Sequence, residues 1–175
     1  MKLAAIGYQA GDGGKVDALL RQVAEQLRAD GYRLAGAVQW NTENASQSKC
    51  DMVLEDLATG KRLDVSADQR GDPHACRLDT YALETVAGLV AGSIGPDVDL
   101  VILNRFGKQE AAKAGFRAVI EAAVANDLPV LTGLNAMHKE LWERFTGAQS
   151  ADIAPDADAV RAWCAKTLPE RRKTA

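Results

Sequence analysis

The chain has 175 residues and a formal net charge of −3, and 47% of its residues are hydrophobic and 26% charged. This length suits one α/β domain, which we expect over residues 1–168, followed by a basic C-terminal tail over residues 169–175. The composition is that of a globular protein and excludes intrinsic disorder. The slight negative charge argues against a nucleic-acid-binding surface, which depends on many clustered Lys and Arg side chains. A small anionic molecule or another protein is the expected partner.

The sequence also argues against a membrane protein or an exported protein. No apolar run approaches the roughly 18 residues of a membrane-spanning helix, and Leu3–Ile6 is too short for a signal peptide. The three cysteines, Cys50, Cys76 and Cys164, are odd in number and not closely paired, which suits a reducing compartment better than a disulfide framework. We therefore expect a cytoplasmic protein that does not bind membranes.

The first elements along the chain form a strand, helix, strand unit. Leu3–Tyr8 is a short apolar run that predicts a buried strand, and the glycine-rich stretch after it predicts a tight turn. From Lys15 to Asp30 the apolar residues recur at helical spacing, and Gly31 provides a stop. Leu34–Trp40 indicates a second strand, at a separation typical of parallel pairing.

The middle of the chain changes to a hairpin pattern. Two short runs, Met52–Leu57 and Arg62–Val65, flank a Thr-Gly turn at Gly60. The polar residues 69–77 predict a loop, after which Asp79 can cap a helix. We expect that helix to bury one stripe, formed by Ala82, Leu83, Val86, Leu89 and Val90.

The second half of the chain alternates strands and helices. Val98–Leu103 is an apolar run without alternation, which predicts a central strand buried on both faces. An Ala-rich helix over residues 109–126 should follow, then a strand over 129–132 and helices over 138–145 and 156–167. The inward residues of the Ala-rich helix should be Phe116, Val119, Ile120 and Val124.

This order of elements predicts a P-loop-like α/β fold, with a mostly parallel, doubly wound sheet of about five strands and one inserted β-hairpin. Leu3–Tyr8 and Leu100–Leu103 are both apolar throughout, and both precede polar loops. We expect these two segments to be neighbouring inner strands.

The most informative motif is the glycine-rich loop between the first predicted strand and the first predicted helix. A phosphate-binding loop needs glycines whose N–H groups point inward, a helix N-terminus, and a Lys that reaches the outer phosphates. The candidate phosphate-binding residues are Gly11, Asp12, Gly13, Gly14, Lys15 and Val16. Two positions depart from G-x-x-x-x-G-K-[ST], because Gln9 replaces the leading glycine and Val16 replaces the hydroxyl that holds Mg²⁺. The alternative interpretation is a glycine-rich turn that binds no ligand.

A second group of polar residues follows the predicted central strand. Ligands of parallel sheets bind beyond the C-terminal strand ends, and Asn104, Arg105, Lys108 and Glu110 stand there. A P-loop enzyme would place an Asp for Mg²⁺ and often a Glu for water where this chain has Asn104 and Arg105. An amide lacks the charge that attracts Mg²⁺, so we predict no metal site. Asn104 can instead bond to nearby backbone, and Glu110 can cap the next helix.

Cys50, His74 and Cys76 are a third candidate group. The hairpin and the loop after it can bring these side chains together, but a zinc site usually needs four such ligands. Separate reduced cysteines are the simpler interpretation. His138 is a lone histidine near Trp142, and we interpret it as structural.

Five segments together carry a family resemblance: Gly14-Lys15, Gly36–Gln39, Cys50–Gly60, Cys76–Asp79 and Leu103–Glu110. Over nearly its whole length the chain resembles the bacterial family catalogued as domain of unknown function 2478, which in turn resembles the small P-loop nucleoside-triphosphatases. The resemblance implies a P-loop scaffold. Because members are described beside molybdate-transport or nitrogen-fixation genes, it also implies a regulatory or metal-trafficking setting.

The sequence therefore predicts a protein that binds ATP, GTP or a phosphate-like oxyanion such as molybdate at residues 11–15, with weak or absent hydrolysis. If the protein is instead an active nucleoside-triphosphatase, Lys15 would stabilise the outer phosphates and Glu110 would orient water. Arg105 or Lys108 would then neutralise developing charge. A further alternative, favoured by the altered Mg²⁺ positions, is a non-catalytic regulatory or interaction module with an unidentified protein partner.

Overall fold

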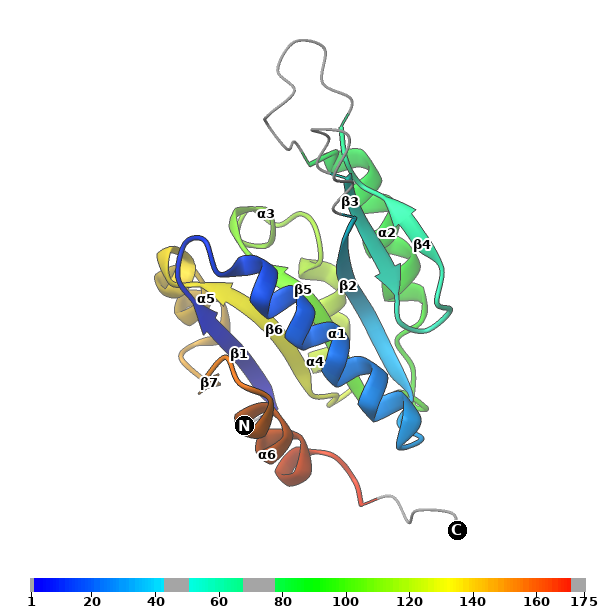
Figure 1. Ribbon diagram of the computed structural model, residues 1–175, viewed down its shortest axis with the longest axis vertical. Helices are drawn as coiled ribbons and strands as arrows, with labels where there is room; N and C mark the ends of the chain where they lie inside the picture. The colour runs from blue at the N-terminus through cyan, green and yellow to red at the C-terminus, as the bar shows by residue number, and fades with distance from the viewer. Residues whose placement is uncertain (1, 43–50, 68–77, 171–175) are drawn as a thin grey trace.

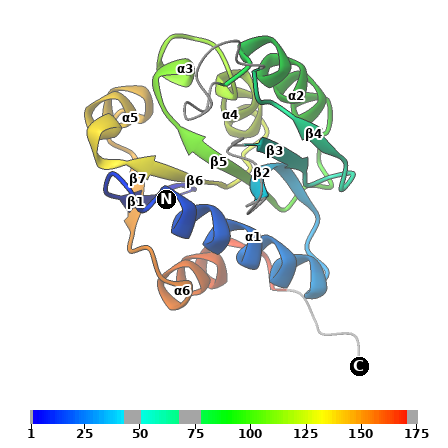
Figure 2. The ribbon, with the colours of Figure 1, turned by 45° about the horizontal axis from the view of Figure 1, so that its top comes forward.

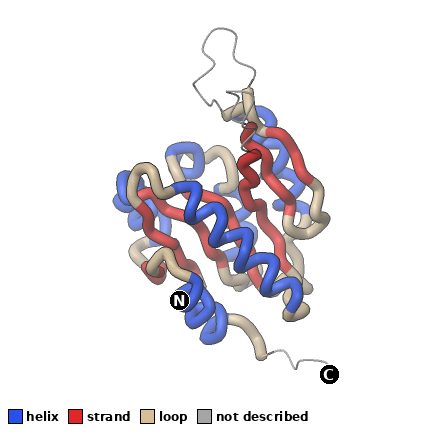
Figure 3. Tube along the Cα trace, in the orientation of Figure 1, coloured by secondary structure: helices blue, strands red, loops and turns tan. Residues whose placement is uncertain are grey.

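The computed structural model describes residues 2–42, 51–67 and 78–170 and shows helices packed around one β-sheet (Figure 1; Figure 3). Within these residues the sheet has seven strands in the order β4-β3-β2-β5-β6-β1-β7. The strands are β1 (Leu3–Tyr8), β2 (Leu34–Thr42), β3 (Asp51–Asp56), β4 (Arg62–Asp64), β5 (Leu100–Phe106), β6 (Val130–Asn135) and β7 (Ser150–Ile153). Strands β2, β5, β6, β1 and β7 are parallel, whereas β3 and β4 form an antiparallel hairpin at one edge. The predicted fold class is confirmed, and the arrangement is compatible with a P-loop nucleoside-triphosphatase-like fold.

Helices cover both faces of the sheet. On one face lie α1 (Gly13–Ala29) and α6 (Ala157–Thr167); on the other lie α2 (Thr80–Gly92), α4 (Arg117–Ala125) and α5 (Lys139–Thr146) (Figure 2). The short α3 (Lys108–Ala111) follows β5, and a 3₁₀ helix, η1 (Ala136–His138), follows β6. In the part of the chain that the structure describes, no helix is long and apolar enough to cross a membrane.

Strand β5 shows why its sequence lacks alternation. Leu100 and Ile102 pack on the face covered by α1, and Val101 and Leu103 pack on the opposite face. All four side chains are fully buried. A strand between two helical layers needs apolar side chains at every position, so the continuous apolar run follows from this packing.

The expectation that β1 and β5 are neighbours is wrong. Strand β6 lies between them and pairs with both, with Ile6 opposite Gly133 on one side and Leu103 opposite Thr132 on the other. An apolar run indicates burial but does not indicate which strand is adjacent, and β6 is as buried as the strands it separates. Gly133 permits the tight fit, since a Cβ there would lie 2.7 Å from the carbonyl oxygen of Asn104.

The single helix expected over residues 109–126 is in fact two helices, α3 and α4. Between them Lys113 and Gly115 have positive φ angles of 66° and 59°, which a continuous helix does not allow. The Glu110 carboxylate stabilises the break by accepting a hydrogen bond from the N–H of Phe116 at 3.2 Å. Helical spacing continued across this break, which hid it in the sequence.

Two residues expected in buried stripes are exposed. Val124 is 53% exposed and Leu89 is 46% exposed. Each is a direct sequence neighbour of a buried residue, Ala123 and Val90. One step along a helix turns a side chain by about 100°, which carries both residues off the stripe and out of the core.

The hairpin is attached to α1 and β2 through Glu55. Its carboxylate accepts hydrogen bonds from Arg28 Nη1 at 2.9 Å and Trp40 Nε1 at 2.8 Å, and Arg62 Nε lies 3.5 Å away. Burial by itself would raise the pKa of Glu55, but these partners outweigh burial and lower its pKa below the usual value. The predicted hairpin is therefore confirmed, and it is held by an ion-pair cluster that the sequence did not reveal.

Candidate functional site

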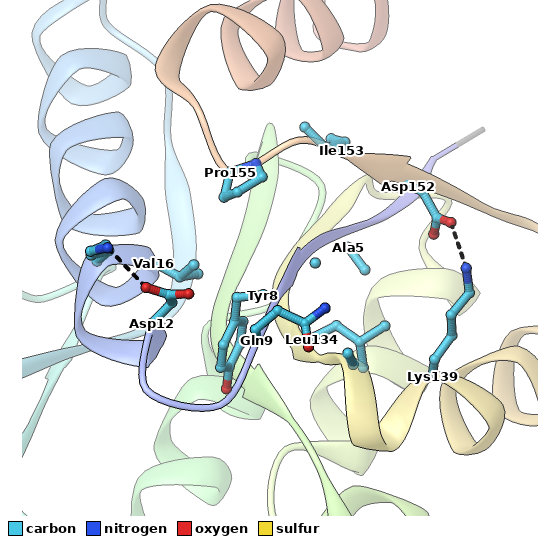
Figure 4. Close-up of a pocket in the computed structure, with 13 residues that line it drawn as sticks. Ala5, Tyr8, Gln9, Asp12, Val16, Leu134, Lys139, Asp152, Ile153 and Pro155 are labelled. Carbon is cyan, nitrogen blue, oxygen red and sulfur yellow. Dashed lines mark hydrogen bonds and ion pairs between the residues drawn. The ribbon is translucent and has the colours of Figure 1, made fainter.

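The connections after β1 and β6 leave the sheet toward opposite faces. Strand β1 leads into α1 on one face, whereas its neighbour β6 leads through η1 into α5 on the other. In open parallel sheets this divergence forms a crevice beyond the C-terminal strand ends, where ligands bind. The structure has a cleft at this place (Figure 4).

This cleft, which we call the loop cleft, has a volume of about 510 Å³. Its lining comes from β1, β6, β7 and the segments that follow them, and includes Tyr8, Asp12, Lys15, Lys139, Asp152 and Pro155. The volume lies within the range of small-molecule sites, and most of the remaining lining is apolar.

The loop between β1 and α1 is a tight β-turn. The Asp12 N–H donates to the Gln9 carbonyl at 3.1 Å, and Gly11 has a positive φ of 93°, which is typical of the third residue of a type II turn. Gly13 and Gly14 are the first residues of α1. Because the first N–H groups of a helix have no acceptor inside it, these two glycines bring backbone donors to the loop.

Val16 contributes to packing in this loop. Its side chain is buried in the core beneath β6, where its Cγ1 lies 3.1 Å from the position that a Cβ on Gly133 would take. Its N–H donates to the carbonyl of Asp12 at 3.3 Å. A valine side chain cannot ligate Mg²⁺, so a metal ion at this loop would lack the usual hydroxyl ligand.

Lys15 is paired within its own loop. Its Nζ lies 2.9 Å from Asp12 Oδ1, and both side chains are exposed to solvent. The hydrogen bond and the negative charge of Asp12 raise the pKa of Lys15 above its ordinary value. The positive charge expected to meet a phosphate is therefore balanced by the carboxylate three residues before it.

A second ion pair stands across the loop cleft from Asp12 (Figure 4). Lys139 Nζ lies 3.2 Å from Asp152 Oδ2, joining the start of α5 to β7. The sequence did not indicate either residue. Asp152 belongs to β7, a short edge strand that was not predicted, and Lys139 has no motif around it.

Arg105 contacts the start of α1 through Asp17 and Gly13. Its Nε and Nη2 donate to the two oxygens of Asp17 at 3.2 and 2.6 Å, and its guanidinium lies against Gly13, where a Cβ would be 2.9 Å from Nη2. Burial lowers the pKa of Arg105, but the hydrogen bonds and charge of Asp17 raise it by more. Sequence reasoning missed Asp17, although an Asp three residues before Leu20 in a buried helical stripe is a usable signal for a buried ion pair.

Tyr8 links this pair to the loop cleft. Its ring centroid lies 5.8 Å from Arg105 Cζ, and the ring is almost fully buried at the end of β1. Burial raises the pKa of the Tyr8 hydroxyl, although the nearby Arg105 charge acts in the opposite direction. The phenol therefore remains protonated and acts as a neutral part of the wall.

The predicted strand-end residues line a different cavity, which we call the strand-end cavity. It has a volume of about 430 Å³ and is lined by Gln39, Asn104, Arg105, Lys108, Glu110 and His138, among others. None of these lines the loop cleft, which contains Lys15. Of the four predicted catalytic residues, Asn104, Arg105 and Glu110 therefore line one cavity and Lys15 lines the other, although Arg105 also contacts Gly13 of the loop that carries Lys15.

Asn104 and Glu110 are engaged in structural hydrogen bonds. Asn104 accepts from the N–H of Gln39 at 3.0 Å and donates to its side-chain oxygen at 2.9 Å. Glu110 accepts from the N–H groups of Gly107 and Phe116 at 2.9 and 3.2 Å. The bonding of Asn104 to nearby backbone and the capping by Glu110, both considered from the sequence, are present.

Among the three cysteines, Cys164 lies within the described residues. Cys50, His74 and Cys76 lie outside the described residues. Cys164 is buried in the core beside α1, and burial raises the pKa of its thiol to about 11. This thiol is therefore protonated and unreactive at neutral pH.

Comparisons with known proteins support the scaffold. A family model described as "Protein of unknown function (DUF2478)" matches residues 3–163. The chain is also 34% identical over 172 residues to a protein of Bradyrhizobium diazoefficiens, "Molybdenum import ATP-binding protein ModC 2". That alignment covers 98% of this chain but 19% of the relative, so the chain spans only a small part of that protein. No solved structure matched the chain.

Proposed function

Because the chain belongs to the family described as Protein of unknown function (DUF2478), its activity has to be inferred from its site, and we propose that it binds a nucleotide or a phosphate-like oxyanion in the loop cleft. The observation that carries this proposal is the position of the cleft, beyond β1 and β6 where their connections diverge. Its volume of about 510 Å³ suits a mononucleotide.

The charges in the cleft suit an exchangeable anion. Lys15 and Lys139 each face the cleft, and each is paired with a carboxylate on an exposed surface. Exposed ion pairs contribute only about 0 to 1 kcal/mol, so a phosphate group displaces Asp12 from Lys15 at small cost. The N–H groups of Gly13 and Gly14 then supply further donors to the anion.

The relative suggests which ligands to try first. The relative is named as an ATP-binding protein of molybdenum import, and 98% of this chain aligns with 19% of that protein. ATP and molybdate are therefore the first candidates, within a molybdenum-linked setting. A cytoplasmic location is part of the same proposal and rests on the cysteine pattern.

Hydrolysis is expected to be weak or absent. Phosphoryl transfer needs a metal site, a group that orients water and a cation at the transferred phosphate. The amide of Asn104 is bonded to Gln39, and the Glu110 carboxylate is bonded to backbone. Their engagement also favours the second candidate function, a non-catalytic regulatory module that acts on an unidentified protein partner.

Calorimetry and thermal unfolding with ATP, ADP, phosphate and molybdate, each with and without Mg²⁺, test the proposal. A ligand at about one hundred times its Kd adds about 2.7 kcal/mol of stability, which raises Tm by roughly 5–10 °C in a chain of this size. The variant Lys15→Ala should weaken binding, whereas Lys166→Ala, an exposed lysine on α6, serves as the matched control.

Three outcomes separate the candidates. Binding that depends on Lys15 without turnover supports the proposal. Binding of none of these ligands removes it and leaves the regulatory module. Steady-state hydrolysis at ~1 s⁻¹ or faster, in the ordinary enzyme range, that disappears in Lys15→Ala would establish an active nucleoside-triphosphatase.

A further inference from the structure

The strand-end cavity has one wall that is apolar and preformed. Leu54, Val65, Leu83 and Phe116 line it, and each is at most 6% exposed. These side chains come from the hairpin, the segment after it, α2 and the turn before α4, and they belong to one packed core. Close-packed core side chains keep their positions, so this wall offers a ready surface to a flat or branched hydrocarbon group.

Cationic side chains from β5 and α3 also line the cavity. Lys108 is exposed, and among the described residues no carboxylate pairs with it. Arg105 also lines the cavity, but its guanidinium donates through Nε and Nη2 to Asp17, and its Nη1 lies 3.4 Å from the position that a Cβ on Gly13 would take. Lys108 thus supplies a cation with free donors, and Arg105 adds a positive charge that Asp17 holds in place.

The two buried polar side chains in the lining, Glu110 and Asn104, already have hydrogen-bond partners. Both oxygens of Glu110 accept from backbone N–H groups, and the amide of Asn104 is joined to the amide of Gln39. Glu110 also lines the cavity, but its side chain is only 5% exposed and its two oxygens face the backbone N–H groups of Gly107 and Phe116. A ligand that pairs with Lys108 and Arg105 brings its own acceptors, and a carboxylate, sulfonate or phosphate matches these two cations best.

We propose that the strand-end cavity is a second small-molecule site, separate from the loop cleft, that binds an organic anion with an apolar body. The apolar body lies against Leu54, Leu83 and Phe116, and the acidic group lies between Lys108 and Arg105. The two cavities adjoin where Arg105 approaches the Tyr8 ring at 5.8 Å, but they share no cationic residue in their linings. The inference therefore stands without the function proposed for the loop cleft.

The probe for this site is 8-anilinonaphthalene-1-sulfonate, an aromatic sulfonate whose fluorescence rises when apolar surface covers it. Wild-type protein should bind it saturably. Lys108→Ala should weaken binding about three- to fivefold, the scale of one exposed charge pair, and Lys166→Ala should leave it unchanged. Leu78→Glu should also weaken it, because Leu78 lines the cavity at 37% exposure and the new carboxylate would repel the sulfonate.

Three controls distinguish binding at this site from nonspecific binding to apolar surface. This probe also binds loosened proteins, so each variant must keep the wild-type urea midpoint to be compared. The uncharged analogue N-phenyl-1-naphthylamine should bind more weakly than the sulfonate and equally to wild type and Lys108→Ala. Lys15→Ala should keep full affinity for the sulfonate, whatever it does to nucleotide binding.

Equal affinity of wild type, Lys108→Ala and Leu78→Glu for the sulfonate would overturn the proposal, as would equal binding of the uncharged analogue. A second measurement covers variants that fold poorly. In wild-type protein, titration with the sulfonate should shift the backbone amide resonances of Leu83, Lys108 and Phe116. Shifts confined to other parts of the molecule would place the probe elsewhere and overturn the assignment.

Discussion

Removing Arg105 should reduce the stability of the fold more than removing its partner Asp17. The Asp17 side chain is 0% exposed, whereas that of Arg105 is 40% exposed. In Arg105→Met the buried carboxylate loses hydrogen bonds of 3.2 and 2.6 Å and cannot reach water, so we expect a loss of about 3–5 kcal/mol. In Asp17→Asn the guanidinium can turn toward solvent, and a discounted loss of about 1–2 kcal/mol is expected.

The double variant Asp17→Leu/Arg105→Met completes the test. Replacing both partners of a buried ion pair by apolar groups is often nearly neutral, so the double variant should be more stable than Arg105→Met alone. Urea denaturation gives the free energies, with Glu121→Gln as control. That change breaks the exposed Arg117–Glu121 pair, 2.7 Å apart, and should shift stability by less than about 0.5 kcal/mol.

Two results would refute this reasoning. Equal losses in Arg105→Met and Asp17→Asn would show that burial does not decide the cost. A double variant as unstable as the sum of Asp17→Leu and Arg105→Met, each measured alone, would show that the two side chains are not coupled and that Arg105 does not stabilise the loop through Asp17.

Three other predictions follow from single contacts. Gly36→Ala should abolish folding or cost more than about 3 kcal/mol, because φ is 116° and a Cβ would lie 1.9 Å from the carbonyl oxygen of Ile102; circular dichroism of the purified variant measures this. Glu55→Gln should cost about 1–2 kcal/mol at pH 7 by urea denaturation. The folded pKa of Glu55 is lowered, so its contribution is complete above the unfolded value of about 4.3 and is lost as pH falls through the folded pKa. The difference from wild type should therefore shrink as the pH is lowered below the unfolded value, and a difference that does not change with pH would contradict the cause given. ATP hydrolysis should stay below ~1 s⁻¹ in a phosphate-release assay and should be the same in Lys15→Ala and Lys166→Ala.

The local elements were readable from the sequence because each depends on its own side chains. The first strand, the glycine-rich turn and the first helix are where the spacing placed them, with Gly11 in the left-handed conformation of the turn. The hairpin was readable from its Thr-Gly turn at Gly60, which has a φ of 74°. Short edge strand β7 escaped because Ser150–Ile153 is four residues long and only partly apolar.

Only part of the candidate site could be predicted from the sequence. Gly13, Gly14 and Lys15 were found from a motif, which is a pattern within one segment. Asp17 and Asp152 were missed because their roles depend on Arg105 and Lys139, which are distant in the chain.

By itself the sequence determined the fold class, the family and the loop that faces the cleft, since periodicity, turn residues and motifs act over a few positions. Only the tertiary structure decided that β6 lies between β1 and β5. It also decided that Asn104 and Glu110 line a cavity apart from Lys15. Strand order and side-chain pairing come from packing between distant segments, and an apolar or charged residue in the sequence does not specify which of many partners it will meet.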